Sequence, residues 1–262
     1  MTKNVLVLGD VIGNAGCRAV VSGLKSLIKK FSADFVVVNG ENSADGFGIT
    51  PEIATNIFAA GADVVTTGNH IWQKKEILEY LDRESRLLRP DNYPPGNPGH
   101  GYCVIETRGL RFGVINLQGR VRLPSIECPF RRAKELLRKA KSEADVVIID
   151  FHAESTEEKE AFALYVDGDA ALVFGTHTHV QTADERVLPN GTAYITDVGA
   201  TGPRDSVIGF EPRISVERSL TQMPFRNEVS DNLAFIHGVI VKVDADTGKA
   251  IRISRYSEAS IV

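Results

Sequence analysis

The run VLVLGD at residues 5–10 decides the fold class, because four apolar residues lead directly into a glycine and a carboxylate. A continuous apolar run of this kind is typical of a strand that is covered on both faces. Five further runs share the pattern, at 35–38, 63–65, 114–117, 146–149 and 171–174. Segments with apolar residues at helical spacing lie between them, at 15–31, 50–58, 73–81, 129–141 and 156–165. Buried strands that alternate with helices predict an α/β fold.

The C-terminal part of the chain has a different pattern. Strand-like segments follow residue 171 at 192–196, 232–243 and 250–256, with no long helix expected between them. We therefore predict a second, antiparallel or mixed sheet at this end. The chain has no repeat or flexible linker, so we expect one domain over residues 1–262. The Pro/Gly-rich stretch 89–101 is expected to be an ordered loop, and the weakly patterned segment 202–232 a functional one.

Composition narrows the possible functions. The 262 residues are 43% hydrophobic and carry a net charge of −4, which disfavours a protein that wraps duplex DNA by bulk charge. The three cysteines form no CxxC pair, as expected in a reducing compartment. No apolar run near the start is long enough for a signal peptide or a membrane span. These features predict a cytoplasmic protein that contacts neither membrane nor duplex DNA.

Each predicted buried strand runs into a short polar cluster. Because ligands bind at the carboxyl ends of strands in α/β sheets, these clusters are expected to meet at one place. Four of the six histidines lie in them. The candidate ligands are two carboxylates, two amides and four imidazoles: Asp10, Glu41, Asn42, Asn69, His70, His152, His177 and His179.

This mixture of nitrogen and oxygen ligands, without a thiolate, suits Mn, Fe or Zn in a reactive rather than a structural site. Eight candidates are too many for one tetrahedral ion and suit two. A bridging carboxylate can hold two ions ~3.5–4 Å apart, which is the arrangement that assists displacement at phosphorus.

The ordered motifs resemble a known family. GNH (68–70), the single His152 after a strand, and GTHTH (175–179) resemble the later motifs of calcineurin-like metallophosphoesterases. The first two motifs depart from that superfamily: Asp10 lacks the histidine of D-x-H, and Glu41 replaces the bridging aspartate. The YmdB-like bacterial metallophosphoesterases share both departures, together with GENSADGFGIT (40–50), INLQGR (115–120) and ITDVGATGPRDSVIG (195–209). The resemblance covers residues 4–243 and implies an α/β/β/α sandwich of two stacked mixed sheets flanked by helices.

The resemblance also implies a role for each ligand. Glu41 would bridge two metals, while His70 would stand beside them as a general acid rather than a ligand. In an extended His177-Thr178-His179 segment both imidazoles would point the same way and serve adjacent ions. The remaining ligands divide into two sets: Asp10, Asn42 and His179 for one metal, and Asn69, His152 and His177 for the other.

The implied activity is hydrolysis of phosphodiesters such as 2′,3′-cyclic nucleotides. Two divalent ions, Fe or Mn with Zn as a third choice, would activate a hydroxide that attacks phosphorus in line. His70 as general acid would contribute roughly 10²–10⁴-fold. The resemblance further implies a small diester substrate, with RNA as a further partner. We also expect a homo-oligomer. The alternative is a regulatory nucleotide- or RNA-binding protein that keeps the metal site with little turnover.

Simpler interpretations exist for single residues. Asp10 could cap the helix that begins near Gly13, and Asn42 or Asn69 could be left-handed turn residues. His152 alone could be a satisfied histidine at a strand end. The glycines at 9, 13 and 16 do not match the G-x-G-x-x-G dinucleotide fingerprint, and no P-loop is present.

Several residues outside the cluster also carry expectations. We expect His237 to be structural, His100 to be an exposed loop residue, and Trp72 to pack in the core. Phe47, between two glycines, is a candidate for contact with a base. Arg120 and Arg122 are candidate phosphate contacts, and they open a basic block (120–141) that we interpret as a solvated helix face.

Overall fold

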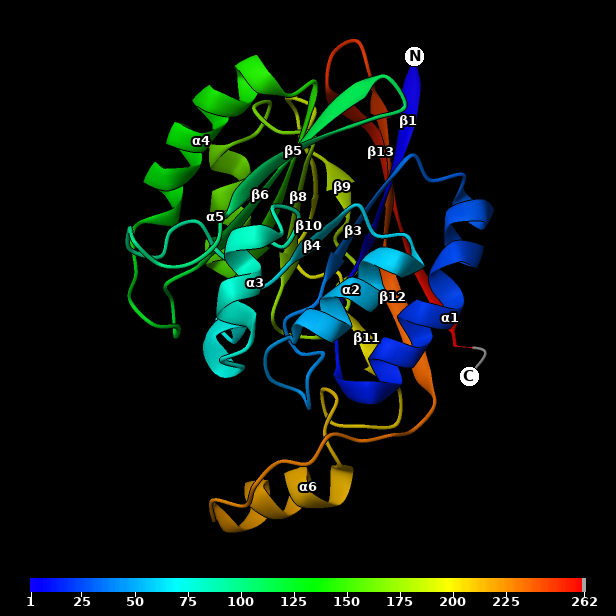
Figure 1. Cartoon of the computed structure of the whole chain (residues 1–262), viewed down its shortest axis with the longest axis vertical. Coiled ribbons are helices and arrows are strands. Elements are labelled where there is room, and N and C mark those ends of the chain that lie inside the picture. The colour runs from blue at the N-terminus through cyan, green and yellow to red at the C-terminus, as the bar shows by residue number, and fades with distance from the viewer. Residues whose placement is uncertain (261–262) are drawn as a thin grey trace.

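Two β-sheets stacked face to face form the centre of the structure, a computed structural model that describes residues 1–260 (Figure 1). Helices cover the outer face of each sheet, which gives the four layers expected from the sequence.

The first sheet has strand order β2-β11-β12-β1-β3-β4, and β13 pairs with β12. Its N-terminal half is parallel, because β1 pairs with β3 and β3 with β4 in the same direction. The long strand β12 runs antiparallel to β1 and joins the C-terminal part of the chain to this sheet. The bounds are β1 (Thr2–Leu8), β2 (Asp10–Val11), β3 (Phe35–Asn39), β4 (Val64–Thr66), β11 (Ala200–Pro203), β12 (Ala234–Asp244) and β13 (Lys249–Ala259).

The second sheet has strand order β5-β6-β7-β8-β10-β9. Its middle strands β6, β7, β8 and β10 are parallel, and antiparallel strands close both edges. The bounds are β5 (Tyr102–Thr107), β6 (Leu110–Gln118), β7 (Val146–His152), β8 (Leu172–Thr176), β9 (Arg186–Val187) and β10 (Ala193–Ile195).

The hydrophobic core has three layers. The middle layer is formed by strand residues of both sheets, among them Val5, Phe35, Phe112 and Ile148, and Phe35 stacks on Phe112. One outer layer lies under α1 (Gly13–Phe31), α2 (Pro51–Ala60) and α3 (Ile77–Arg83), and the other under α4 (Pro129–Glu143) and α5 (Thr156–Tyr165). Strands buried on both faces explain why their sequences are continuous apolar runs rather than alternating ones.

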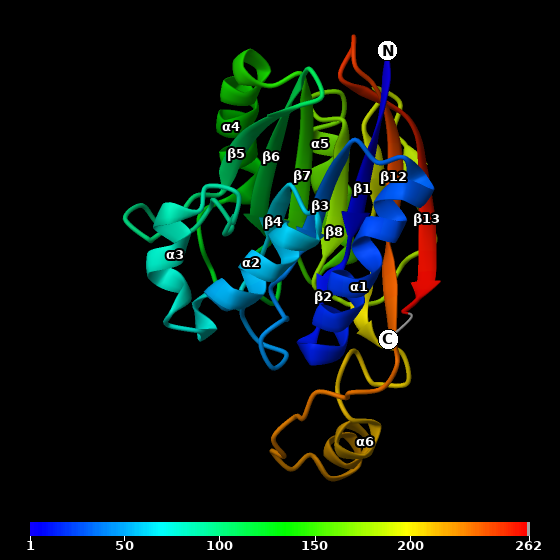
Figure 2. The same cartoon turned by 45° about the vertical axis from the view of Figure 1, so that its right-hand side comes forward.

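Three expectations about the elements were wrong. The C-terminal strands form no sheet of their own, because β10 joins the second sheet while β12 and β13 join the first. The predicted helix 73–81 is a short 3-10 helix, η1 (Ile71–Gln73), followed by α3. The segment 202–232, which we call the arm, contains a helix, α6 (Pro212–Thr221). This helix buries none of its residues and projects from the body of the molecule (Figure 2).

The topology brings the carboxyl ends of β1, β3 and β4 in the first sheet close to those of β7 and β8 in the second. All five ends lie on the side of the body from which the arm projects (Figures 1 and 2). Within residues 1–260, no helix combines the length and apolar character needed to cross a lipid bilayer.

Candidate metal centre

The predicted ligands come from five strand ends, and both sheets contribute. Asp10 begins β2 directly after β1, Glu41 follows β3, and Asn69 follows β4. His152 is the last residue of β7, and His177 follows β8. The centre therefore lies at the junction of the two sheets.

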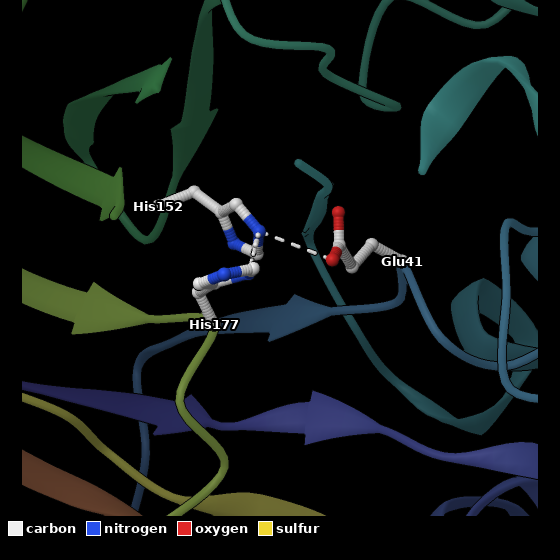
Figure 3. Close-up of side chains that lie close together, drawn as sticks. All are labelled: Glu41, His152 and His177. Carbon is white, nitrogen blue, oxygen red and sulfur yellow. Dashed lines mark hydrogen bonds and ion pairs between the residues drawn. The ribbon is translucent and has the colours of Figure 1, made fainter. Parts of the chain in front are cut away.

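The Nε2 atom of His152 is the point where these side chains converge. It lies 3.1 Å from Glu41 Oε1, 3.0 Å from Asn69 Oδ1 and 3.1 Å from His177 Nδ1. Figure 3 shows Glu41 and both imidazoles pointing toward one another from separate elements. An imidazole nitrogen can make one hydrogen bond at most, so this convergence is not explained by hydrogen bonding.

The partner of the other ring nitrogen fixes the tautomer of His152. Its Nδ1 lies 2.8 Å from the hydroxyl oxygen of Thr176, and that hydroxyl donates to Asp150 Oδ1 at 2.7 Å. The hydroxyl proton is used on Asp150, so the threonine oxygen accepts the proton on Nδ1. Burial lowers the pKa of His152 well below its usual value, which keeps the ring neutral. Nε2 therefore carries a lone pair that faces other lone pairs, an arrangement that a cation would stabilise.

The other two histidines are oriented in the same way. His177 Nε2 lies 3.2 Å from Glu154 Oε2, so a proton on Nε2 leaves the lone pair of Nδ1 toward the centre. Burial lowers the pKa of His177 to about 3. His179 Nδ1 lies 3.0 Å from the carbonyl oxygen of Ile208, which leaves the lone pair on its Nε2. Each imidazole thus has an acceptor on one ring nitrogen, and the other nitrogens of His152 and His177 lie 3.1 Å apart.

The oxygen ligands are buried and incompletely hydrogen-bonded. Asp10 Oδ1, Glu41 Oε1 and Asn42 Oδ1 are buried oxygens without a hydrogen-bond partner in the described part of the chain. Burial raises the pKa of Asp10 well above its usual value, and Asp197, Glu41 and Asp150 add to the shift. Burial also raises the pKa of Glu41. Buried carboxylates that gather without cationic partners fit a site built for metal ions.

The simpler interpretations of single ligands are wrong. The N-cap of α1 is Ile12, and no side chain caps this helix, so Asp10 is not its cap. Neither Asn42 nor Asn69 is among the described residues with positive φ. His152 is more than a satisfied strand-end histidine, because its Nε2 meets Glu41, Asn69 and His177 at once, which one hydrogen bond does not explain.

The expected extended conformation of His177-Thr178-His179 is also wrong. His177 has φ +97° and His179 has φ +64°, both in the region that L-residues seldom adopt. Asp197 holds this turn by accepting hydrogen bonds from the backbone N–H and the hydroxyl of Thr178.

A cavity of about 290 Å³ opens over the centre. Its polar lining includes Glu41, His70 and His177, and its apolar lining consists of Phe47, Ile208 and Phe210. Arg120 and Arg122 lie outside this lining; Arg120 follows β6, and its backbone N–H donates to Glu158.

The remaining expectations agree with the structure. His237 lies within β12, and His100 is exposed. Trp72 lies in η1, packs on the core and meets Tyr93 edge to face.

Residues around the ligands were missed by sequence reasoning. Asp150 orients His152 through Thr176, Glu154 faces His177, and Asp197 pairs with the buried Lys159 at 2.8 Å. Asp150 could have been found from the sequence, because a carboxylate between the apolar residues of a buried strand indicates a functional or hydrogen-bonded group. The other contacts depend on tertiary packing.

Solved structures show which class this fold belongs to. The chain superposes on NAD nucleotidase from Haemophilus influenzae with a TM-score of 0.64, over 99% of this chain and 56% of that one. At 14% identity this likeness concerns the fold alone. A structure described as a novel phosphatase from Mycoplasma pneumoniae matches with TM-score 0.93 and 38% identity, over 99% of this chain and 94% of that chain. The predicted calcineurin-like phosphoesterase fold is therefore confirmed.

The chain belongs to the YmdB-like family, because the family model described as "YmdB-like protein" matches residues 6–256. A Bacillus subtilis relative named 2′,3′-cyclic-nucleotide 2′-phosphodiesterase is 45% identical over 96% of this chain and 95% of its own. A Mycoplasma pneumoniae relative named as a phosphatase/phosphodiesterase of unproven activity is 40% identical over 94% of this chain and 90% of its own.

Proposed function

We propose that the chain is a metal-dependent phosphodiesterase that hydrolyses 2′,3′-cyclic nucleotides at a dinuclear centre. The observation that carries the proposal is the convergence of uncompensated lone pairs on His152 Nε2, from Glu41, Asn69 and His177. The name of the Bacillus relative, at 45% identity over nearly the whole chain, supports the activity and the substrate class.

The candidate ligands would divide between two ions, and Glu41 would be a ligand of both. Fe or Mn fits this nitrogen-and-oxygen set best, and Zn is the third choice. When bound, the ions would activate water as the nucleophile and neutralise the phosphoryl oxygens. Asp10, Asn42 and His179 would hold one ion, and Asn69, His152 and His177 the other.

His70 is the proposed general acid. Its backbone N–H lies 3.3 Å from Glu41 Oε2, and its ring lines the cavity. The amide nitrogen of Asn69 lies 3.3 Å from the Nε2 atom of His70. The Nδ1 atom of the same ring has no hydrogen-bond partner in the described chain. We propose that the imidazolium form of His70 gives its Nδ1 proton to the leaving oxygen of the diester and becomes a neutral imidazole.

The main test combines metal analysis with turnover. We expect about two transition-metal ions per purified chain, and hydrolysis of both bis-p-nitrophenyl phosphate and 2′,3′-cyclic AMP. Glu41→Gln should lose metal and activity, whereas Glu52→Gln, on the exposed first turn of α2, should keep both. An active, metal-replete Glu41→Gln protein would refute the proposal. Metal and nucleotide binding without turnover in the parent would indicate the regulatory alternative.

The second test distinguishes the role of His70 as general acid from that of a metal ligand. His70→Ala should keep its metal but lose about 10²–10⁴-fold in kcat, because proton transfer to the leaving group is lost. The exposed His100→Ala is the matched control and should behave like the parent. Loss of metal in His70→Ala would make His70 a ligand instead.

Other features of the proposal concern the whole chain. We propose a single-domain, homo-oligomeric, cytoplasmic protein. Its substrates are small diesters, and its further partner is RNA that carries a 2′,3′-cyclic phosphate end. Light scattering coupled to size exclusion tests the assembly, and cleavage of a short RNA with a 2′,3′-cyclic end tests the substrate.

A further inference from the structure

The cavity over the metal centre has two chemically different walls. Carboxylate, amide and imidazole groups form one wall, and Phe47, Ile208 and Phe210 form the other, which we name the apolar wall. With metal ions bound at the first wall, a ligand that fits both walls would carry an anionic group next to an apolar one. The candidate metal centre explains the polar wall but leaves the apolar wall without a function.

Phe47 is the more exposed of the two phenylalanines, at 37%, and Phe210, 7% exposed, lies behind it. Their ring centroids lie 5.6 Å apart with the planes inclined by 27°, so the rings stack on each other. Phe47 also meets the His70 ring edge to face at 5.0 Å. Because the phenylalanine rings touch, a third planar group would lie against the pair rather than between its members.

The wall is assembled from two segments far apart in the sequence. Phe47 belongs to the loop that carries the ligands Glu41 and Asn42, and the Asn42 amide donates to the Gly46 carbonyl. Phe210 belongs to the base of the arm. Gly46 lets the two segments approach, because a Cβ there would lie 2.7 Å from Val229 and 3.2 Å from Phe210.

A strained turn presents Ile208. Val207 and Phe210 exchange both backbone hydrogen bonds around Ile208 and Gly209, which have φ +50° and +100°. Such turns favour Asn, Asp or Gly at the first central position, and a β-branched residue there is an outlier. Ile208 is also 50% exposed. The turn thus holds the partly exposed Ile208 in the cavity lining, next to Phe210.

The same turn is linked to the metal ligands. The Ile208 carbonyl accepts the hydrogen bond from His179 Nδ1 at 3.0 Å, so one turn both orients a ligand and supplies the apolar wall. Phe47, 37% exposed, leaves part of its ring open. The apolar wall therefore lines the same cavity as Glu41 and His177.

We propose that the apolar wall binds the nucleobase of the substrate by stacking, so that the site selects nucleotide diesters over diesters without a base. The inference rests on the proposed function and extends it to selectivity. Aromatic side chains suit this role because each of the nucleobases offers a planar face on which an aromatic ring can stack. Phe47 and Phe210 are thus selectivity residues rather than catalytic ones.

The test compares substrates that differ only in the base. Phe47→Leu and Phe210→Leu keep apolar volume but remove the aromatic face. We expect the ratio of kcat/KM for 2′,3′-cyclic AMP to kcat/KM for methyl riboside 2,3-cyclic phosphate to fall about tenfold in each variant. Tyr165→Leu, an exposed aromatic of α5, is the matched control and should leave the ratio unchanged.

A binding measurement complements turnover. For the Mn²⁺-loaded protein, calorimetry should show that either variant weakens adenosine 3′-monophosphate about tenfold relative to inorganic phosphate. A ratio equal to that of Tyr165→Leu, or equal losses on both diesters, would overturn the apolar wall as a base site. If the parent hydrolyses neither diester, the proposed function fails, and the calorimetry alone decides the inference.

Discussion

At the scale of single residues, Thr176 decides which way the proton of His152 faces. Its hydroxyl is the link in a chain from Asp150 to the ring, and all three members are fully buried. Asp150 also accepts from Asn39 and Thr66, and burial raises its pKa to about 7. Thr176, which is not itself a candidate ligand, thus determines which ring nitrogen of His152 is free to bind a metal. Control by such a neighbouring hydrogen-bond partner is typical of metal-binding histidines.

Replacing Thr176 by valine should therefore weaken metal binding. Thr176→Val leaves Nδ1 without its acceptor, so the ring can adopt the wrong tautomer, and we expect about 10–100-fold lower metal affinity. Thr66→Val is the matched control, because it removes another donor to Asp150 at 2.5 Å but leaves the contact between Thr176 and His152. Both changes should cost about 1–3 kcal/mol of stability. Competition with a chromophoric chelator measures affinity, and equal affinities in the two variants would contradict this role.

At the scale of elements, the buried strand runs predicted where the candidate ligands meet. β1, β3, β4, β7 and β8 were expected from their apolar runs, and the candidate ligands lie at or just after the ends of these strands. This worked because both the burial of a parallel strand and the polar residue at its end are local features of the sequence.

The parts that failed depend on long-range contacts. β12 is antiparallel to both β1 and β13, and nothing local shows that it belongs to the first sheet. α6 was missed because it buries no residue, so its sequence has no apolar stripe facing a core. The positive φ values of His177 and His179 were also unforeseeable, since the hydrogen bonds that hold the turn come from Asp197, about twenty residues away.

Helix α5 stabilises that turn through a buried charge. Lys159 is 1% exposed, and its ammonium donates to Asp197 Oδ2 at 2.8 Å. Asp197 in turn accepts from Thr178 and, through its other oxygen, from the backbone N–H of Gly199. The pair therefore connects α5, the histidine turn and the link between β10 and β11.

Removing the lysine should destabilise the protein strongly. Lys159→Met leaves Asp197 buried without its cation, for which we expect a loss of ~3–5 kcal/mol in the free energy of unfolding. The double variant Lys159→Met/Asp197→Asn should recover part of this loss, because the uncompensated charge is gone. Lys30→Met, which breaks the exposed pair with Glu258, is the control and should cost at most ~1 kcal/mol. Urea unfolding measures all three, and similar losses for Lys159→Met and Lys30→Met would contradict the argument.

At the scale of the whole molecule, the candidate metal centre joins the two sheets. Asp10, Glu41 and Asn69 belong to the first sheet, whereas His152 and His177 belong to the second. The sheets otherwise meet through the apolar middle layer of the core. At this end of the interface between the sheets, the groups that meet are the lone pairs of the candidate ligands rather than apolar side chains. A bound metal ion should therefore stabilise the packing of one sheet on the other.

Metal removal should therefore lower global stability as well as activity. Because an ion that binds only the folded chain stabilises it by mass action, Mn²⁺ at about 100 times its Kd should add ~2.7 kcal/mol per site. Thermal unfolding of chelator-treated protein, with and without Mn²⁺, measures this gain. Glu41→Gln should lose most of the metal-dependent rise in Tm because Glu41 is the proposed shared ligand, whereas Glu52→Gln should keep it. Since this readout needs no substrate, an unfolding temperature that does not respond to Mn²⁺ would show that these side chains do not hold a metal between the sheets.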